Sequence, residues 1–154
     1  LEQGKIAASA EEGEEKIKAA IADGSALQKL RAFIEAQGGD PTYIDRPEKF
    51  PLAKNIIEIR AKQSGYVRRI DSMQIGISAM KLGAGRETME DVIDMSAGIV
   101  LAKKVGDVVK IGDVLAVCHT NKEDIEDILK DIENAFVYDA DPFVPAPIVH
   151  RYVK

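Results

Sequence analysis

Apolar positions at helical spacing predict two helices at the start of the chain. Ser9 precedes a run of acidic residues, and Glu12 stands three positions after it, which is the pattern of a capping box. This first helix is expected to end at Gly24, because glycine readily takes the left-handed conformation that closes a helix. From Ser25 a second amphipathic stripe runs to the pair Gly38-Gly39. Its apolar members are Leu27, Leu30, Phe33 and Ile34.

After residue 55 the pattern changes to the alternation of strands. Three prolines interrupt the preceding segment 40–55, which predicts a linker. Beyond it, alternating or continuous apolar runs bounded by turn residues predict short strands. These are Ile57–Ala61, Gly65–Ile70, Gly98–Ala102 and Val114–Cys118, with shorter candidates at Val137–Tyr138 and Ile148–Val153.

Two helices and two turns are expected among these strands. Asp71 is placed to cap a short helix through Met80, and Asn121 to cap a late helix reaching Ala135. The late helix has one apolar stripe, made of Ile125, Ile128, Leu129, Ile132 and Phe136. Gly106-Asp107 and Gly112-Asp113 are turn signals six residues apart, which suits a compact, barrel-like β structure. The predicted fold class is α+β: N-terminal helices, then a compact, mostly antiparallel β domain of barrel-sandwich or hammerhead type with a late helix.

Composition and charge exclude several classes of function. The 154 residues carry a net charge of −5 and no basic face, which argues against a nucleic-acid binder. No apolar stretch approaches the ~20 residues that span a bilayer, and no signal peptide opens the chain. The lone Cys118 lies in an apolar run, so a buried thiol in a reducing cytoplasm is expected. The first residue is Leu1, not methionine, and the opening segment is interpreted as the interior of a longer protein.

The candidate site is the loop Gly83, Ala84, Gly85 and Arg86. Glycines let backbone N–H groups approach an anion, and Arg86 is suited to pair with it. The same Gly-x-Gly also ends a helix in a flexible loop, and the complete nucleotide-binding fingerprints are absent. No metal site is assigned, because His119 and His150 are the only imidazoles and no cysteine cluster accompanies them.

A second candidate is Lys81, within Met80-Lys81-Leu82. This tripeptide is similar to the attachment site of biotin carrier domains, and the segment 105–113 is similar to the turn-rich strands of biotinyl and lipoyl domains. A cofactor on Lys81 is therefore an alternative hypothesis. Against it, Lys81 ends a stretch of helical spacing and is followed by Gly-Ala-Gly instead of a strand.

An ordered set of short motifs resembles the C-terminal domain of the pyrimidine nucleoside phosphorylases, which include the thymidine phosphorylases. The motifs are Gly65-Tyr66-Val67, Lys81 to Arg86, Ile93-Asp94, Ala97 to Val100, Lys103 to Asp107 and Gly112-Asp113. The resemblance covers nearly the whole chain. It implies that residues 1–39 are the last helices of the larger α/β domain, that 40–55 is a linker, and that 56–154 is the C-terminal α+β domain.

The resemblance also implies an activity, which is the reversible phosphorolysis of uridine or thymidine. The family's phosphate loop, roughly Asp-Lys-His-Ser-Thr-Gly-Gly, and its Ser-x-Arg-x-Leu signature do not occur in these 154 residues. No catalytic residue and no cofactor is therefore assigned, phosphate being the co-substrate of the whole enzyme. The chain is expected to be inactive alone, to scaffold the α/β domain and to place the loop at residues 83–86 near the cleft.

The expected partners follow from the same resemblance. They are the N-terminal part of the enzyme and, for the whole enzyme, a second copy in a homodimer. Neither nucleic acid nor membrane is expected. The remaining alternative is a free-standing module whose β domain binds another protein.

Overall fold

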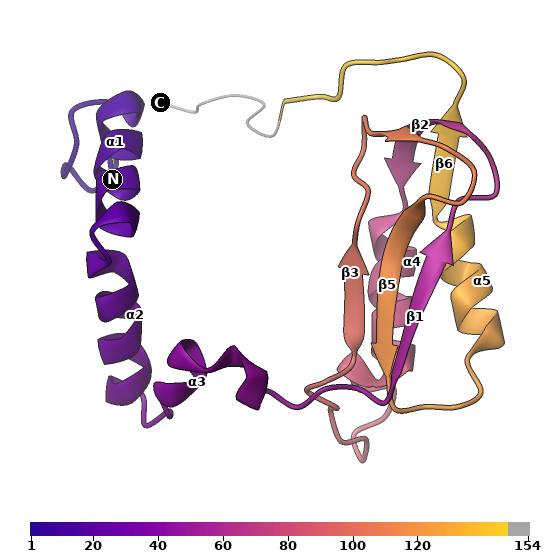
Figure 1. The fold of residues 1–154 in the computed structure, drawn as a ribbon, viewed down its shortest axis with the longest axis horizontal. Coiled ribbons are helices and arrows are strands. Elements are labelled where there is room, and N and C mark those ends of the chain that lie inside the picture. Colours follow the sequence, from indigo (N-terminus) through magenta and orange to yellow (C-terminus); the bar gives the residue numbers. More distant parts are fainter. Residues whose placement is uncertain (148–154) are drawn as a thin grey trace. The chain divides into compact units, whose positions relative to one another are not determined.

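The computed structural model describes residues 1–147 (Figure 1). The chain divides into two compact units, residues 1–50 and residues 51–154. The strand candidate at Ile148–Val153 lies outside the described residues. We call the two parts the N-terminal unit and the C-terminal unit.

The N-terminal unit is helical. It contains α1 (Ala10–Ala22), α2 (Ser25–Ala36), the short α3 (Thr42–Asp45) and a 3₁₀ turn, η1 (Pro47–Lys49). The prediction for the start of α1 is confirmed, because the Ser9 side chain accepts a hydrogen bond from the Glu12 N–H. Its predicted end is confirmed as well, since Asp23 is the C-cap of α1 and Gly24, the next residue, has a φ of 78°. The segment expected as a linker thus contains α3, η1 and the first residue of the first strand.

The apolar stripes of α1 and α2 have little to pack on within this unit. Ala7 and Gly13 are the buried residues among the first 50, and neither has a large side chain. Five larger apolar side chains of the two helices, Ile17, Ile21, Leu27, Leu30 and Phe33, are between 46% and 67% exposed, whereas Ile34 is partly buried. Burial of such stripes is what normally stabilises surface helices. The N-terminal unit therefore presents an apolar surface that its own residues do not cover.

The C-terminal unit contains two antiparallel sheets of three strands each. The strands are β1 (Asn55–Arg60), β2 (Gly65–Ile70), β3 (Gly98–Leu101), β4 (Val108–Val109), β5 (Val114–Thr120) and β6 (Phe136–Asp139). One sheet has the order β1-β5-β3 and the other the order β4-β2-β6. The α+β class with a mostly antiparallel β domain is confirmed, and within residues 1–147 the strands do not close into a barrel.

Two helices cover one side of the first sheet. In Figure 1, α4 (Ser72–Ala79) lies behind β5, and α5 (Glu126–Asn134) lies beside β1. Between helices and strands lies a core that includes Val67, Leu82, Leu115, Cys118 and Ile132, all fully buried. The predicted cap of α4 is confirmed, because the Asp71 carboxylate accepts from the Gln74 N–H. No helix within residues 1–147 is both long enough and apolar enough to cross a lipid bilayer.

The late helix begins later and ends earlier than predicted. It starts at Glu126, and Asn121 does not cap it, because the Asn121 side chain is bonded to other segments. The helical spacing also assigned Phe136 to the stripe of this helix, which is wrong. Phe136 belongs to β6, where it pairs with Ile70 of β2 and is 5% exposed. Ile132 and Phe136 are thus four positions apart but lie on two different elements of the same core.

Two tight turns, Lys104–Asp107 and Lys110–Asp113, have the same set of hydrogen bonds. In each turn the aspartate carboxylate accepts from the lysine backbone N–H, at 2.7 Å and 3.2 Å. In each, the glycine N–H donates to one residue in the segment 61–67, and the carbonyl of the aspartate accepts from the same residue. That residue is Val67 for the first turn and Ala61 for the second, with distances of 2.8–2.9 Å.

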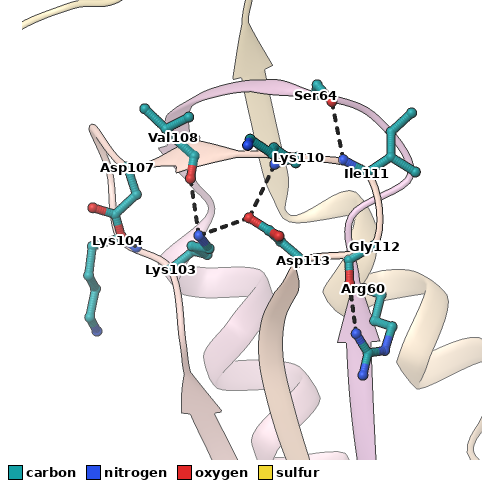
Figure 2. Close-up of polar contacts among 10 residues, drawn as sticks. All are labelled: Arg60, Ser64, Lys103, Lys104, Asp107, Val108, Lys110, Ile111, Gly112 and Asp113. Carbon is teal, nitrogen blue, oxygen red and sulfur yellow. Dashed lines mark hydrogen bonds and ion pairs between the residues drawn. The ribbon is translucent and has the colours of Figure 1, made fainter.

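Lys103 ties the two turns together (Figure 2). Its ammonium donates to the Val108 carbonyl and pairs with the Asp113 carboxylate, both at 3.1 Å. The Ser64 hydroxyl accepts from the Ile111 N–H at 3.1 Å, and Arg60 donates to the Gly112 carbonyl at 2.7 Å. This end of the C-terminal unit is therefore held by polar contacts at several points, and the candidate loop lies elsewhere in the unit.

Candidate functional site

The two ends of the candidate loop meet at its base. We call residues 83–94 the 83–94 loop. The helical chain of α4 continues into one π-helical turn, η2 (Met80–Ala84), which breaks at Gly83 with a φ of 117°. The Asp94 N–H donates to the Gly83 carbonyl at 2.9 Å, closing the loop. A Cβ on Gly83 would lie 3.3 Å from the Ala97 Cβ and 3.4 Å from the Asp94 Cβ, so glycine permits this close approach. Compact loops with adjoining ends are frequently functional.

A polar cluster holds the C-terminal end of the loop at Asp94, which we call the far end. The Asp94 carboxylate accepts from the Ser96 N–H at 2.9 Å and from the Ser96 hydroxyl at 2.6 Å. The Asn121 amide donates to Asp94 at 2.7 Å and to the Ser96 oxygen at 3.1 Å, while its carbonyl oxygen accepts from the Lys54 N–H at 2.8 Å. Asn121 therefore joins the loop to the end of β5 and to the residue before β1.

The N-terminal end of the loop, which follows Leu82 and which we call the near end, is held by a buried hydroxyl. Thr120, the last residue of β5, is fully buried, and its hydroxyl donates to the Leu82 carbonyl at 2.6 Å. The Leu82 side chain is fully buried in the core. Thr120, the last residue of β5, and Asn121, the residue after it, thus anchor the two ends of the loop.

The body of the loop uses its own carboxylate to bind its backbone. Asp91 accepts from the N–H groups of Glu87 and Thr88 at 2.9 Å and 2.8 Å. These bonds hold the pKa of Asp91 below its ordinary value, so it is charged at neutral pH. The two amides that follow Arg86 are therefore occupied and not free for an external anion. The Arg86 side chain is exposed and has no ion-pair partner among residues 1–147. It is the group of the predicted site that remains able to bind an anion.

The outer part of the loop is apolar. Met89 and Val92 of the loop, and Met95 directly after it, are 94%, 89% and 84% exposed. We call these three side chains the apolar tip. At the inner side, Gly85 lies so close to Met80 that a Cβ there would be 2.9 Å from the Met80 Cγ. The loop thus combines a fixed base with an exposed apolar tip and one free cation.

Lys81 does not lie on a β-turn. It belongs to η2, next to the buried Leu82, and its ammonium is 3.9 Å from the Asp131 carboxylate of α5. Its side chain is 39% exposed. The tight turns of the segment that is similar to biotinyl and lipoyl domains lie at residues 104–107 and 110–113 instead. The structure therefore places Lys81 in a different setting from the one that the carrier hypothesis requires.

The remaining candidate groups do not form a reactive site. Burial raises the pKa of the Cys118 thiol to about 11, so the thiol is protonated at neutral pH. His119, its neighbour on β5, pairs with Ile56 and Gly98 and is partly exposed, whereas Cys118 is fully buried. Among residues 1–147, histidine, cysteine and carboxylate side chains do not gather in groups of three that suit a metal ion.

The Asp94 carboxyl is expected to titrate below the ordinary aspartate value of 3.8. The bonds from Ser96 are the main cause, and the bond from the Asn121 amide is a smaller one, so all lower its pKa. Their stabilising contribution is complete above the ordinary pKa and is lost as the pH falls through the lowered one. A carbon-13 NMR titration of the aspartate carboxyls measures this directly. Asn121→Ala should raise the pKa of Asp94 only part of the way, and Asn55→Ala should leave it unchanged. A pKa at or above the ordinary value would contradict the cluster.

Sequence reasoning placed Arg86 and the glycines in one loop but missed the anchors. Asn121 was predicted to be a helix cap, and Thr120 carried no signal beyond its place at the end of an apolar run. An aspartate side chain often accepts a hydrogen bond from the backbone N–H two residues later, as Asp94 does from Ser96. The sequence therefore contained a local signal for this turn. The link from that pattern to Asn121 spans 27 positions and leaves no local trace.

The chain matches a known domain family over the part that contains this loop. A family model described as "Pyrimidine nucleoside phosphorylase C-terminal domain" matches residues 66–139. This range extends from β2 to β6 and includes the 83–94 loop and both anchors.

Curated relatives match most of the chain. The pyrimidine-nucleoside phosphorylase of Staphylococcus haemolyticus (strain JCSC1435) is 43% identical over 143 residues, which is 93% of this chain and 33% of that protein. The protein of the same name from Staphylococcus aureus (strain USA300) is 46% identical over 134 residues, 87% of this chain and 31% of that protein. The chain therefore spans about a third of the length of the curated relatives that it matches.

Proposed function

Since the chain belongs to the pyrimidine-nucleoside phosphorylase family and corresponds to the C-terminal part of such an enzyme, we propose that it acts as that part in the reversible phosphorolysis of uridine or thymidine. The match over 93% of the chain at 43% identity is the observation that carries this proposal. In the reaction, phosphate attacks the anomeric carbon of the nucleoside, and the free base leaves.

The chain alone is proposed to be inactive. The family's phosphate loop and its Ser-x-Arg-x-Leu signature are absent from the 154 residues. These patterns supply the cationic and backbone donors that stabilise the transferred phosphate and the departing base. The proposed contribution of this chain is therefore to complete the cleft, with the chemistry residing in other residues of the enzyme.

The apolar stripes of the N-terminal unit support this division. Five large apolar side chains on α1 and α2 are about half exposed or more, although their spacing is that of helices packed in a domain. We propose that this surface packs on the rest of an α/β domain, which the relatives' additional length would provide. The whole enzyme is proposed to be a homodimer.

The 83–94 loop is proposed to close the cleft over the reacting groups. Loops that close in this way exclude water and complete a catalytic site. Three features support the proposal: a base fixed to β5, an apolar tip, and a free guanidinium at Arg86. In this role Arg86 binds the phosphate or the charge that develops on it, since arginine pairs well with phosphate.

The test is kinetic, in a full-length enzyme whose C-terminal third is this chain, for example joined to the N-terminal two thirds of the Staphylococcus haemolyticus relative. Arg86→Ala should lower kcat/KM for phosphate roughly ten- to a hundred-fold, because a charge-assisted contact to the transferred group is lost. Arg86→Lys should recover part of this loss. Arg68→Ala removes another exposed arginine, on β2, and should have little effect.

Each outcome bears on one part of the proposal. Unchanged rate and unchanged phosphate KM in Arg86→Ala would overturn the role of the loop. Phosphorolysis by the 154-residue chain alone would overturn its proposed inactivity. A mass above 16.8 kDa for the chain purified from its native host, with the increment on Lys81, would favour the carrier hypothesis.

A further inference from the structure

The side chain of Asn121 joins three segments that are distant in sequence. Its amide nitrogen donates to Asp94 at 2.7 Å and to Ser96 at 3.1 Å, and its oxygen accepts from the Lys54 N–H at 2.8 Å. Asparagine offers two donors and one acceptor group, and here all of them are used. Asn121 follows β5 and bonds both the loop and the residue before β1. Within residues 1–147, no other side chain at the base of the loop connects these three segments.

Asn121 is also the part of the base that is open to solvent. Thr120 and Leu82, which hold the near end of the loop, are fully buried in the core. The bond from Asn121 to Asp94 is exposed. The near end of the loop is therefore part of the packed core, whereas the far end depends on exposed polar contacts. The exposed contacts of the loop also include the ion pair between Glu87 and Lys122, at 3.8 Å. A loop that is buried at one end should open at its exposed contacts, because these are the first to break in local unfolding.

We propose that Asn121 is a positioning residue for the 83–94 loop, whose amide fixes the far end of the loop at Asp94 and Ser96 and so sets where Arg86 and the apolar tip are held. This inference rests on the proposed closing role of the loop. Asn121 itself touches no reacting group in this scheme. It acts through the loop. Its loss would displace Arg86, and a small displacement of a group that binds the substrate lowers the rate strongly.

The variant Asn121→Asp tests this sharply. The new carboxylate has nearly the same size and still accepts from the Lys54 N–H, but it cannot donate to Asp94 and it repels the Asp94 charge. The double variant Asn121→Asp with Asp94→Asn restores one donor and one acceptor between the two positions without a second charge. The double variant should therefore recover part of what the single variant loses. The matched control is Asn55→Asp, because the Asn55 amide bonds the Lys122 carbonyl beside the same strand and does not contact the loop.

The first measurement is amide hydrogen exchange in the 154-residue chain. In Asn121→Asp, exchange at residues 87–95 should be about tenfold faster than in the unchanged chain, while the amides of β5 and α5 keep their rates. Asn55→Asp should leave residues 87–95 unchanged. Equal exchange in both variants would overturn the inference, whatever the enzyme assays show. So would faster exchange throughout the C-terminal unit, because Asn121 would then be a general structural residue.

The second measurement is the rate of the full-length enzyme. Asn121→Asp should lower kcat about tenfold with little change in the nucleoside KM, and the double variant should recover part of kcat. An unchanged kcat in Asn121→Asp, together with a loss in Arg86→Ala, would overturn the positioning role and leave the proposed function intact. No loss in either variant would overturn the closing role of the loop instead, and with it the kinetic half of this inference.

Discussion

Replacing Leu82 with alanine should lower the free energy of unfolding of the C-terminal unit by about 2–5 kcal/mol, the usual cost of deleting most of a buried leucine side chain. Leu82 is fully buried, and it belongs to the same core as Leu115 and Ile132. It also lies where α4 passes into the 83–94 loop. Because whole domains are stable by only about 5–15 kcal/mol, this single change should be a large fraction of the total.

The measurement is a urea titration followed by the amide NMR signals of β5, so that the C-terminal unit is observed separately. Met89→Ala is the matched control, since it truncates a long apolar side chain of the adjoining 83–94 loop that is 94% exposed. That variant should change the free energy by less than about 0.5 kcal/mol. A similar small change for Leu82→Ala would mean that Leu82 is not part of the core.

The second large effect is expected from Gly65→Ala, at the start of β2. A Cβ at this position would lie 2.5 Å from the Asp139 carbonyl oxygen of β6, and the φ of Gly65 is 155°. The oxygen belongs to the backbone, so relief requires the two paired strands to separate. We expect a loss of about 3 kcal/mol, from the combined cost of the clash and of a backbone conformation that alanine disfavours.

Two other glycines separate these causes. Gly112 has a φ of 89° but open space where its Cβ would be, so Gly112→Ala should show the backbone cost alone, about 1 kcal/mol. Gly98 also has open space and no positive φ, and Gly98→Ala should be nearly neutral. The same urea titration compares all three. Equal losses at Gly65 and Gly112 would show that the contact with Asp139 is not the cause.

Local patterns in the sequence predicted most elements correctly. Ser9 and Asp71 cap α1 and α4 as expected, because a cap is a contact between residues three positions apart. The strands β1, β2, β3 and β5 were predicted within two residues, since alternation or continuous apolarity within one segment indicates a strand. The short β4 was not predicted, because two residues carry no periodicity.

The errors arose where distant residues decide the structure. Asn121 follows a strand and precedes an apolar stripe, so a cap was the reasonable local prediction, but Asp94 and the Lys54 N–H bind its side chain instead. Phe136 continues the helical spacing of Ile132, but the helix ends before it and pairing with Ile70 places it on β6. The candidate loop was found from its glycines, whereas its anchors depend on contacts across the fold.

The bonds that hold the two tight turns also affect how the chain forms during synthesis. The connection between β1 and β2, which contains Ser64, gains its hydrogen bond from Ile111 only after 47 further positions. At about 5–20 residues per second, the ribosome would leave this connection without its partner for roughly two to ten seconds. Contacts of this range also make folding slow, because the intervening chain must be ordered before they form. The segment from β1 to β2 is therefore a part of the nascent chain whose strands stay unpaired until β4 and β5 are made.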